Sequence, residues 1–140
     1  MRSVRTSLIA AVSLLLFTGA PTVANSAEPD QQMGVAREMI QVLEAYAVYK
    51  MGQYDLAFER YQALAEAGSR QGMYNLGNMH AAGQGTAQSD SKAFEWYLRA
   101  AEAGDKLSMS EVAKAYEAGI GTRADPQLAR HWRERAATED

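Results

Sequence analysis

The chain has 140 residues, about one ordinary domain, and its 47% apolar and 22% charged residues are typical of a folded globular protein. The lack of cysteine excludes disulfide frameworks, thiol catalysis and cysteine-ligated metals, and two histidines leave little for a histidine metal site. Because the net charge is −3 and no cluster of Lys and Arg stands out, we expect no nucleic-acid binding, no metal and no cofactor.

The first 27 residues have the organisation of a secretory signal peptide. Two arginines precede an apolar run of about ten residues, and a small, polar segment follows. The run is shorter than the roughly 20 residues of a membrane-spanning helix, although an uncleaved anchor is the alternative. We expect cleavage after Ala24, Ser26 or Ala27, a linker over 28–35, a periplasmic or secreted location and no stable membrane insertion after cleavage.

The rest of the chain contains an internal repeat of 36 residues. Residues 57–68 and 93–104 are identical at 8 of 12 positions, and a further shift of 36 places 129–137 in the same register. Such self-similarity is the signature of stacked repeats, each too small to bury its apolar face alone. The units run from about 36 to 68, 69 to 104 and 105 to 140.

Each unit has the pattern of two helices joined by a turn. Apolar residues recur at the three-and-four spacing of one helical face, and no segment alternates as a strand would. Good N-cap residues precede the helices and glycines follow them. The spacing predicts an all-α domain of about six helices over residues 36–138. The expected caps are Ser69, Ser89, Asp105 and Asp125, with Gly68 and Gly104 at helix ends.

These motifs resemble a known family. Asn-Leu-Gly at 75–77, Gly-Gln-Gly-Thr at 83–86, Ala-Phe-Glu-Trp-Tyr at 93–97 and Ala-Ala-Glu-Ala-Gly at 100–104 are similar to the Sel-one-like repeat of the tetratricopeptide superfamily. The resemblance implies an α-solenoid of about three stacked helix-turn-helix repeats, whose first helices line a concave groove. It also implies that the groove holds a protein or peptide partner and that the chain catalyses nothing.

The same resemblance places four side chains on the concave side. They are Tyr74 and Asn78 in the second repeat and Ser110 and Lys114 in the third. Asn78 and Lys114 together suit a carboxylate or the backbone amide of an extended peptide, the asparagine bidentately and the lysine by charge. The alternative is that they are ordinary residues of an exposed helix face.

Other motifs are weaker signs of chemistry. Ser89 and Lys92 have the spacing of the serine and lysine of penicillin-recognising enzymes, but no Lys-Thr-Gly element accompanies them and Ser89 suits an N-cap. His80 corresponds to Tyr116 one repeat later, so we expect a packed helix residue rather than a metal ligand. We expect no catalytic residue.

The last predicted helix suggests a second contact surface. Solenoids usually cover their terminal apolar face, and only three residues follow Ala137. We therefore expect Trp132 at or near a surface used for self-association or for docking a partner. The alternative is that Trp132 packs inward against its own first helix.

The sequence thus predicts a secreted or periplasmic adaptor that binds a protein or peptide. Two other functions stay open. One is a cell-wall or β-lactam-active enzyme related to cysteine-rich Sel-one-like proteins. The other is a structural subunit of an envelope assembly.

Overall fold

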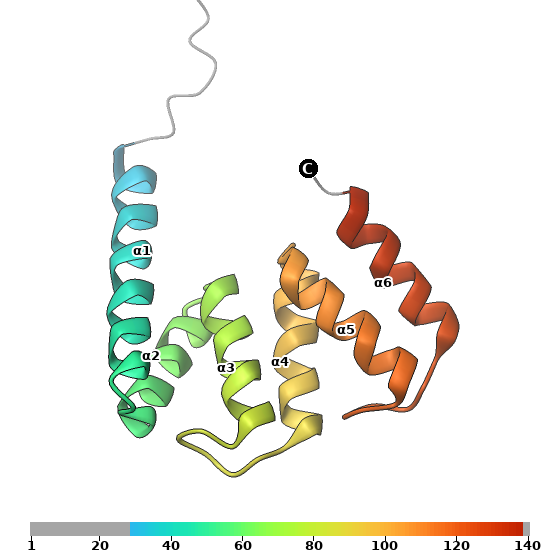
Figure 1. The fold of residues 1–140 in the computed structure, drawn as a ribbon. Coiled ribbons are helices and arrows are strands. Elements are labelled where there is room, and N and C mark those ends of the chain that lie inside the picture. Colours follow the sequence, from blue (N-terminus) through green and yellow to red (C-terminus); the bar gives the residue numbers. More distant parts are fainter. Residues whose placement is uncertain (1–28, 139–140) are drawn as a thin grey trace, which may run out of the picture.

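The computed structural model describes residues 29–138, and all of their regular structure is helical (Figure 1). This confirms the predicted all-α solenoid of about three helix pairs. The helices are α1 (Pro29–Lys50), α2 (Tyr54–Glu66), α3 (Arg70–Ala82), α4 (Asp90–Glu102), α5 (Lys106–Ala118) and α6 (Pro126–Thr138). The predicted signal peptide, residues 1–27, lies outside the described residues.

Helix α1 starts before the predicted repeat domain, because residues 29–35, which were expected to form a linker, are helical. The helix begins at Pro29, whose fixed φ and missing N–H suit a first helical position, and Asp30 places a negative charge beside the positive end of the helix dipole. The sequence pattern missed this start because the first turns bury no apolar face: every residue from 29 to 41 is exposed. At 22 residues α1 is much longer than the five other helices, which have 13 each.

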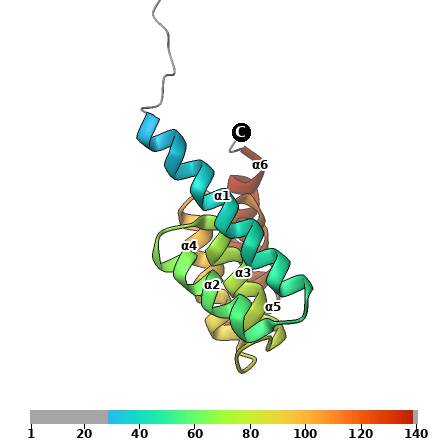
Figure 2. The same ribbon diagram turned by 90° about the vertical axis from the view of Figure 1, so that its left-hand side faces the viewer.

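The helices stack in pairs. In Figures 1 and 2, α3 and α5 lie on one side of the stack and α2 and α4 on the other. Helix α1 stands at one end, with its N-terminal half projecting beyond its neighbours, and α6 stands at the opposite end (Figure 1). The first helices of successive pairs, α1, α3 and α5, are therefore the ones available to line one face.

The predicted caps hold the helix starts in place. Ser69 accepts a hydrogen bond from the Gly72 amide at 3.1 Å, and Asp105 accepts one from the Ser108 amide at 2.7 Å. Ser89 and Asp125 cap α4 and α6 in the same way. Each bond satisfies a backbone N–H that has no partner within its helix.

Two turn glycines couple each repeat to the one before it. Gly85 and Gly121 both have positive φ, 69° and 72°. A Cβ at Gly85 would meet the carbonyl of Tyr54, and one at Gly121 would meet the carbonyl of Asp90. Because Tyr54 and Asp90 begin α2 and α4, each glycine turn packs directly on the start of the preceding second helix, and no larger residue fits there.

The core divides into two clusters along the stack. One lies among α1, α2 and α3 and includes Tyr61, Leu76 and Met79. The other lies among α4, α5 and α6 and includes Met109 and Trp132. This division is expected of a solenoid, in which each repeat contacts only its neighbours.

Candidate peptide-binding groove

Two neighbouring hollows open between successive first helices. Together they form the groove. The first, of about 220 Å³, lies among α1, α2 and α3, and the second, of about 230 Å³, lies among α3, α4 and α5. The first is lined by Tyr46, Tyr49, Tyr61, Asn75, Asn78 and Met79. The second is lined by Ala81, Asp90, Ala93, Phe94, Tyr97, Glu111, Lys114, Ala115 and Ile120.

The two hollows are built from equivalent positions of the repeat. Tyr61 and Tyr97 are both buried and stand 36 residues apart. Asn75 and Asn78 border the first hollow where Glu111 and Lys114 border the second, again 36 residues on. The repeat therefore produces one type of hollow twice, with a tyrosine at its base and two polar side chains at its wall.

Burial keeps both tyrosine hydroxyls protonated. It raises the pKa of Tyr61 to about 12, with a smaller contribution from Tyr46 and Tyr49. It also raises the pKa of Tyr97 well above its usual range, with Glu111 adding to the effect. Both hydroxyls are therefore protonated at physiological pH and able to donate a hydrogen bond.

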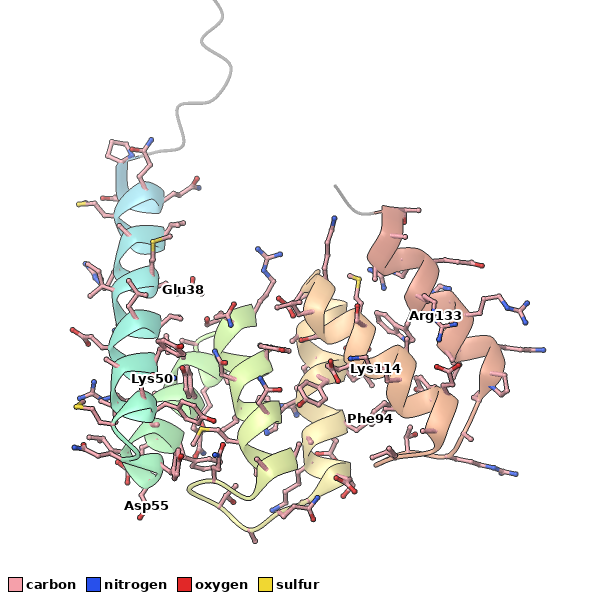
Figure 3. The ribbon with its side chains drawn as sticks, in the orientation of Figure 1. Glu38, Lys50, Asp55, Phe94, Lys114 and Arg133 are labelled. Atoms are coloured by element: carbon pink, nitrogen blue, oxygen red, sulfur yellow. The ribbon has the colours of Figure 1, made fainter. Side chains whose placement is uncertain are left out.

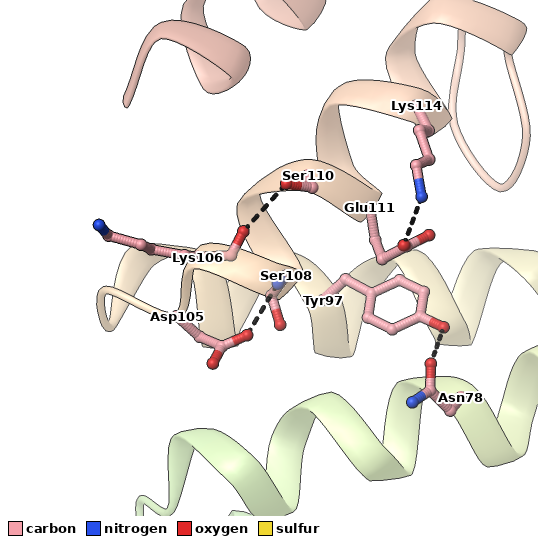
Figure 4. A network of polar contacts seen from close by, with 8 residues as sticks. All are labelled: Asn78, Tyr97, Asp105, Lys106, Ser108, Ser110, Glu111 and Lys114. Atoms are coloured by element: carbon pink, nitrogen blue, oxygen red, sulfur yellow. Dashed lines mark hydrogen bonds and ion pairs between the residues drawn. The ribbon is translucent and has the colours of Figure 1, made fainter. Parts of the chain in front are cut away.

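A hydrogen bond from Tyr97 fixes the orientation of the Asn78 side chain. The Tyr97 hydroxyl donates to its Oδ1 at 2.7 Å, which links the two hollows, and Figure 4 shows the tyrosine between Asn78 of α3 and Glu111 of α5. The second lone pair of Oδ1 and the Nδ2 donors have no partner among the described residues. The predicted bidentate contact to a peptide amide is thus open to an Asn78 side chain whose orientation is already fixed.

Lys114 differs from the prediction because it has an anionic neighbour. Its Nζ lies 2.7 Å from Oε1 of Glu111, one turn earlier on α5 (Figure 4). This hydrogen bond raises the pKa of Lys114. The pair offers a donor and an acceptor with little net charge, so it matches the N–H and C=O of a peptide backbone better than an isolated carboxylate.

The other two predicted side chains make mainly internal contacts. The half-buried Tyr74 ring packs on Tyr97, with centroids 6.0 Å apart. The Ser110 hydroxyl donates to the carbonyl of Lys106 within α5 at 3.1 Å. Tyr74 therefore supports the groove tyrosine, and the Ser110 hydroxyl already has a helix acceptor.

The structure corrects the predicted position of Trp132, which lies inside the fold rather than at an exposed surface. Its side chain is only 7% exposed and packs in the second core cluster, and the Arg135 guanidinium covers the ring at 4.9 Å from its centroid. The inward-packing alternative is the right one. The reason is the repeat itself, since Trp132 follows Trp96 at 36 residues and its helix must fill the space against α5.

Sequence reasoning missed the part of the groove that α1 supplies. The turn 51–53 is four residues shorter than the turns 83–89 and 119–125, so equivalent positions in the first repeat lie 32 rather than 36 residues away. At that spacing Tyr46 corresponds to Asn78 and then to Lys114. Aligning the buried small residues Ala45 and Gly77 would have revealed it.

Elsewhere, the weaker motifs have structural roles. Ser89 is an N-cap, as expected, and His80 is buried with its ring edge-to-face on Phe58, centroids 5.3 Å apart. Among residues 29–138, no three His, Asp or Glu side chains gather closely enough to hold a metal ion. Within the same range no helix has the length and apolar character needed to cross a bilayer.

Comparison with known proteins identifies the class. The Sel1 repeat family model matches residues 70–105 and 106–140, just over half of the chain. The structure is similar to a Sel1 repeat protein from Oxalobacter formigenes, with a TM-score of 0.67 and 28% identity over 79% of this chain and 46% of that one. It is also similar to a protective antigen present in uropathogenic Escherichia coli strains that displays an SLR fold, with a TM-score of 0.66 and 26% identity over 77% and 24% of the respective chains. Among curated proteins, none matches the sequence.

The chain belongs to the Sel1 repeat family. Sel1 repeats are helical scaffolds that typically mediate protein interactions and generally have no enzymatic activity. The chain spans less than half of the length of either related structure.

Proposed function

We propose that the protein is an adaptor that holds an extended segment of a protein partner in the groove, without catalysis. The main support is that the same type of hollow occurs twice. It is bordered by the polar pair Asn75 and Asn78 in one copy and by Glu111 and Lys114 in the next. An extended peptide presents its amide groups periodically, and a row of equivalent polar side chains is suited to meet them.

The groove is prepared for a ligand before binding. Asn78 is fixed by Tyr97, and Lys114 by Glu111, so little side-chain freedom is lost when a peptide arrives. Tyr46 and Tyr49 add aromatic surface at the α1 end. The preferred partner segment is therefore extended, has little net charge, and carries an apolar side chain that reaches these tyrosines.

We further propose that the adaptor works in the periplasm or outside the cell. The support is the sequence of residues 1–27, with its charged start, short apolar run and small-residue end. Expression in a bacterial host followed by intact-mass measurement of the periplasmic fraction tests this. The expected mass lacks 24 to 27 residues, and a periplasmic species that retains Met1 would contradict it.

The groove is tested by capturing the partner and then altering two side chains. Cross-linking in the native envelope followed by mass spectrometry identifies the partner, and binding is then measured with the purified protein. Asn78→Ala combined with Lys114→Ala should weaken binding at least about tenfold, the loss of roughly 1.4 kcal/mol, while helicity stays unchanged. The matched control is Gln62→Ala combined with Lys92→Ala, two exposed residues of the α2 and α4 side. Loss of binding in the control pair instead would place the partner on the opposite side of the stack.

A further inference from the structure

Helix α1 carries an uncovered apolar face. Met33, Ile40 and Leu43 are 58%, 57% and 60% exposed, and Met39 and Tyr46 beside them are also more than half exposed. The buried residues of the helix, Ala45 and Val48, lie on its opposite side, against α2 and α3. Figure 3 shows that the side chains on the outer side of α1 meet no other helix.

A helix half without tertiary contacts is only marginally stable in water. The first three turns of α1 have no buried residue, so an added helix packed against their apolar side chains would stabilise them. A membrane surface does not fit, because α1 carries three acidic residues against Arg37 and Lys50 and lacks the basic polar face of interfacial helices.

The outer face has the spacing of a helix-pairing seam. Its positions follow one another at intervals of three and four residues, which is the pattern that keeps one stripe of a helix against a partner helix. The seam consists of Met33, Ala36, Ile40, Leu43, Ala47 and Lys50. All six are exposed, so a second helix can reach the seam without unpacking the solenoid.

We propose that this seam is a dimer interface, in which α1 packs antiparallel on α1 of a second copy of the chain. In this pairing Ile40 faces Leu43 of the second copy and Ala36 faces Ala47, so large meets large and small meets small. Each contact occurs twice, as the two-fold symmetry of a dimer requires. At the ends, the long stem of Lys50 covers Met33 of the second copy and its ammonium group reaches water.

Charge complementarity selects the same pairing. Arg37 and Glu44 both lie directly beside the seam on one side, and antiparallel packing brings Arg37 of each copy against Glu44 of the other. Neither forms an ion pair with another described residue. A parallel pair would instead place Lys50 against Lys50 and leave Arg37 and Glu44 apart, so it is disfavoured.

Sedimentation velocity of the purified protein tests the association. Because two short helices make a small interface, we expect the apparent mass to double over roughly 10–500 μM. Ile40→Glu combined with Leu43→Glu should remain monomeric throughout. Its midpoint of unfolding should equal that of the wild-type monomer, since both positions are exposed. Leu107→Glu, at a position 57% exposed on α5, should dimerise like the wild type, and so should Leu128→Glu on α6. A wild type that stays monomeric, a dimer that survives the α1 variant, or a dimer lost in either control overturns the proposal.

Charge exchange tests the pairing partners. Arg37→Glu alone, or Glu44→Arg alone, should raise the dimer dissociation constant about tenfold, because two like-charge contacts replace two attractive ones. The variant that carries both changes should return to within about twofold of the wild type, since the attraction is restored with its sign reversed. Additive weakening in that variant would overturn the antiparallel register.

Cysteine cross-linking tests the direction of the helices, and the chain has no native cysteine to interfere. An equimolar mixture of Ala36→Cys and Ala47→Cys proteins should oxidise to a covalent heterodimer. Each variant alone should not, because in an antiparallel pair equal positions are more than about 15 Å apart along the helix axis. Efficient homodimer formation by either variant alone would show a parallel pair and overturn the proposal.

Discussion

The helices at the two ends of the solenoid, α1 and α6, differ in which side chains they bury. Helix α6 buries its largest apolar side chain, Trp132, leaves Leu128 39% exposed and turns Arg130, Arg133 and Glu134 to solvent. Helix α1 does the reverse: it buries only Ala45 and Val48 and exposes a stripe of large apolar residues. The sequence pattern predicted a contact surface at the C-terminal helix, whereas in the structure the stripe of exposed large apolar side chains lies on α1. Position in the repeat therefore decides burial more strongly than composition does, because α6 is in register with α4 and the N-terminal half of α1 extends beyond the repeat.

The sharpest test of this contrast is a truncation at each end. Trp132→Ala should lower the free energy of unfolding by about 3–5 kcal/mol, since it removes a large buried side chain and leaves a cavity. Ile40→Ala, at a similarly large but exposed side chain, should change it by less than about 0.5 kcal/mol. Denaturant unfolding below the concentration of self-association measures both. Equal effects at the two ends would mean that Trp132 is not part of the core.

Replacing a glycine by alanine should have different effects on stability in the packed interior and in the projecting half of α1. A Cβ at Gly77 would lie 2.6 Å from Cε1 of Tyr97, whose ring is buried and hydrogen-bonded to Asn78. Gly77→Ala should therefore cost about 1–3 kcal/mol by overpacking. Urea unfolding measures the loss, and a loss of the Tyr97–Asn78 contact would also appear as weaker partner binding. A variant as stable as the wild type would mean that Tyr97 can leave its position at the base of the groove.

Acid should weaken the middle of the stack more than its ends. Burial lowers the pKa of His80 below its usual 6.5, with Lys92 acting in the same direction and Glu95 against it. In the unfolded chain the imidazole takes up a proton at about its usual pKa of 6.5, whereas in the folded chain burial lowers that pKa. The contribution of neutral His80 to stability is therefore fully present above pH 6.5 and is lost as the pH falls towards the lower pKa of the folded chain. His80→Tyr, which installs the residue found at the equivalent position 116, should remove this part of the pH dependence. The midpoints of unfolding at pH 7.5 and pH 5 measure it in both proteins, and the same slope in both would contradict the role of His80.

The smallest effect is expected at the projecting end. Gly34 lies in the interior of α1, and a Cβ there would meet nothing within 4 Å. Gly34→Ala should therefore favour the helix by about 0.5–1 kcal/mol, because alanine loses less backbone entropy than glycine. Since this part of α1 makes no tertiary contact, the gain should appear as added helicity and tighter dimerisation rather than as global stability. A fall in helicity would show that the glycine is needed for a contact at α1.

Much of the fold was determined by the sequence alone, because its signals are local and repeated. The period of 36 residues, the capping residues Ser69 and Asp105 and the positive-φ glycines that end α2 and α4 specify helices, turns and their order. Asn78 and Lys114 were also predicted to lie where they do by analogy with repeats of this class, and both border the groove.

Other features of the protein depend on contacts between residues that are distant in the sequence. The pairing of Tyr97 with Asn78, the neutralisation of Lys114 by Glu111 and the inward packing of Trp132 each require helices to be brought together. The start of α1 at Pro29 and its uncovered seam escaped the repeat pattern, because the first unit has a shorter turn and a longer first helix than the others. The repeated sequence determines the helices and turns within each unit, because these depend on nearby residues. The stacking of the units determines which side chains stay exposed for a partner.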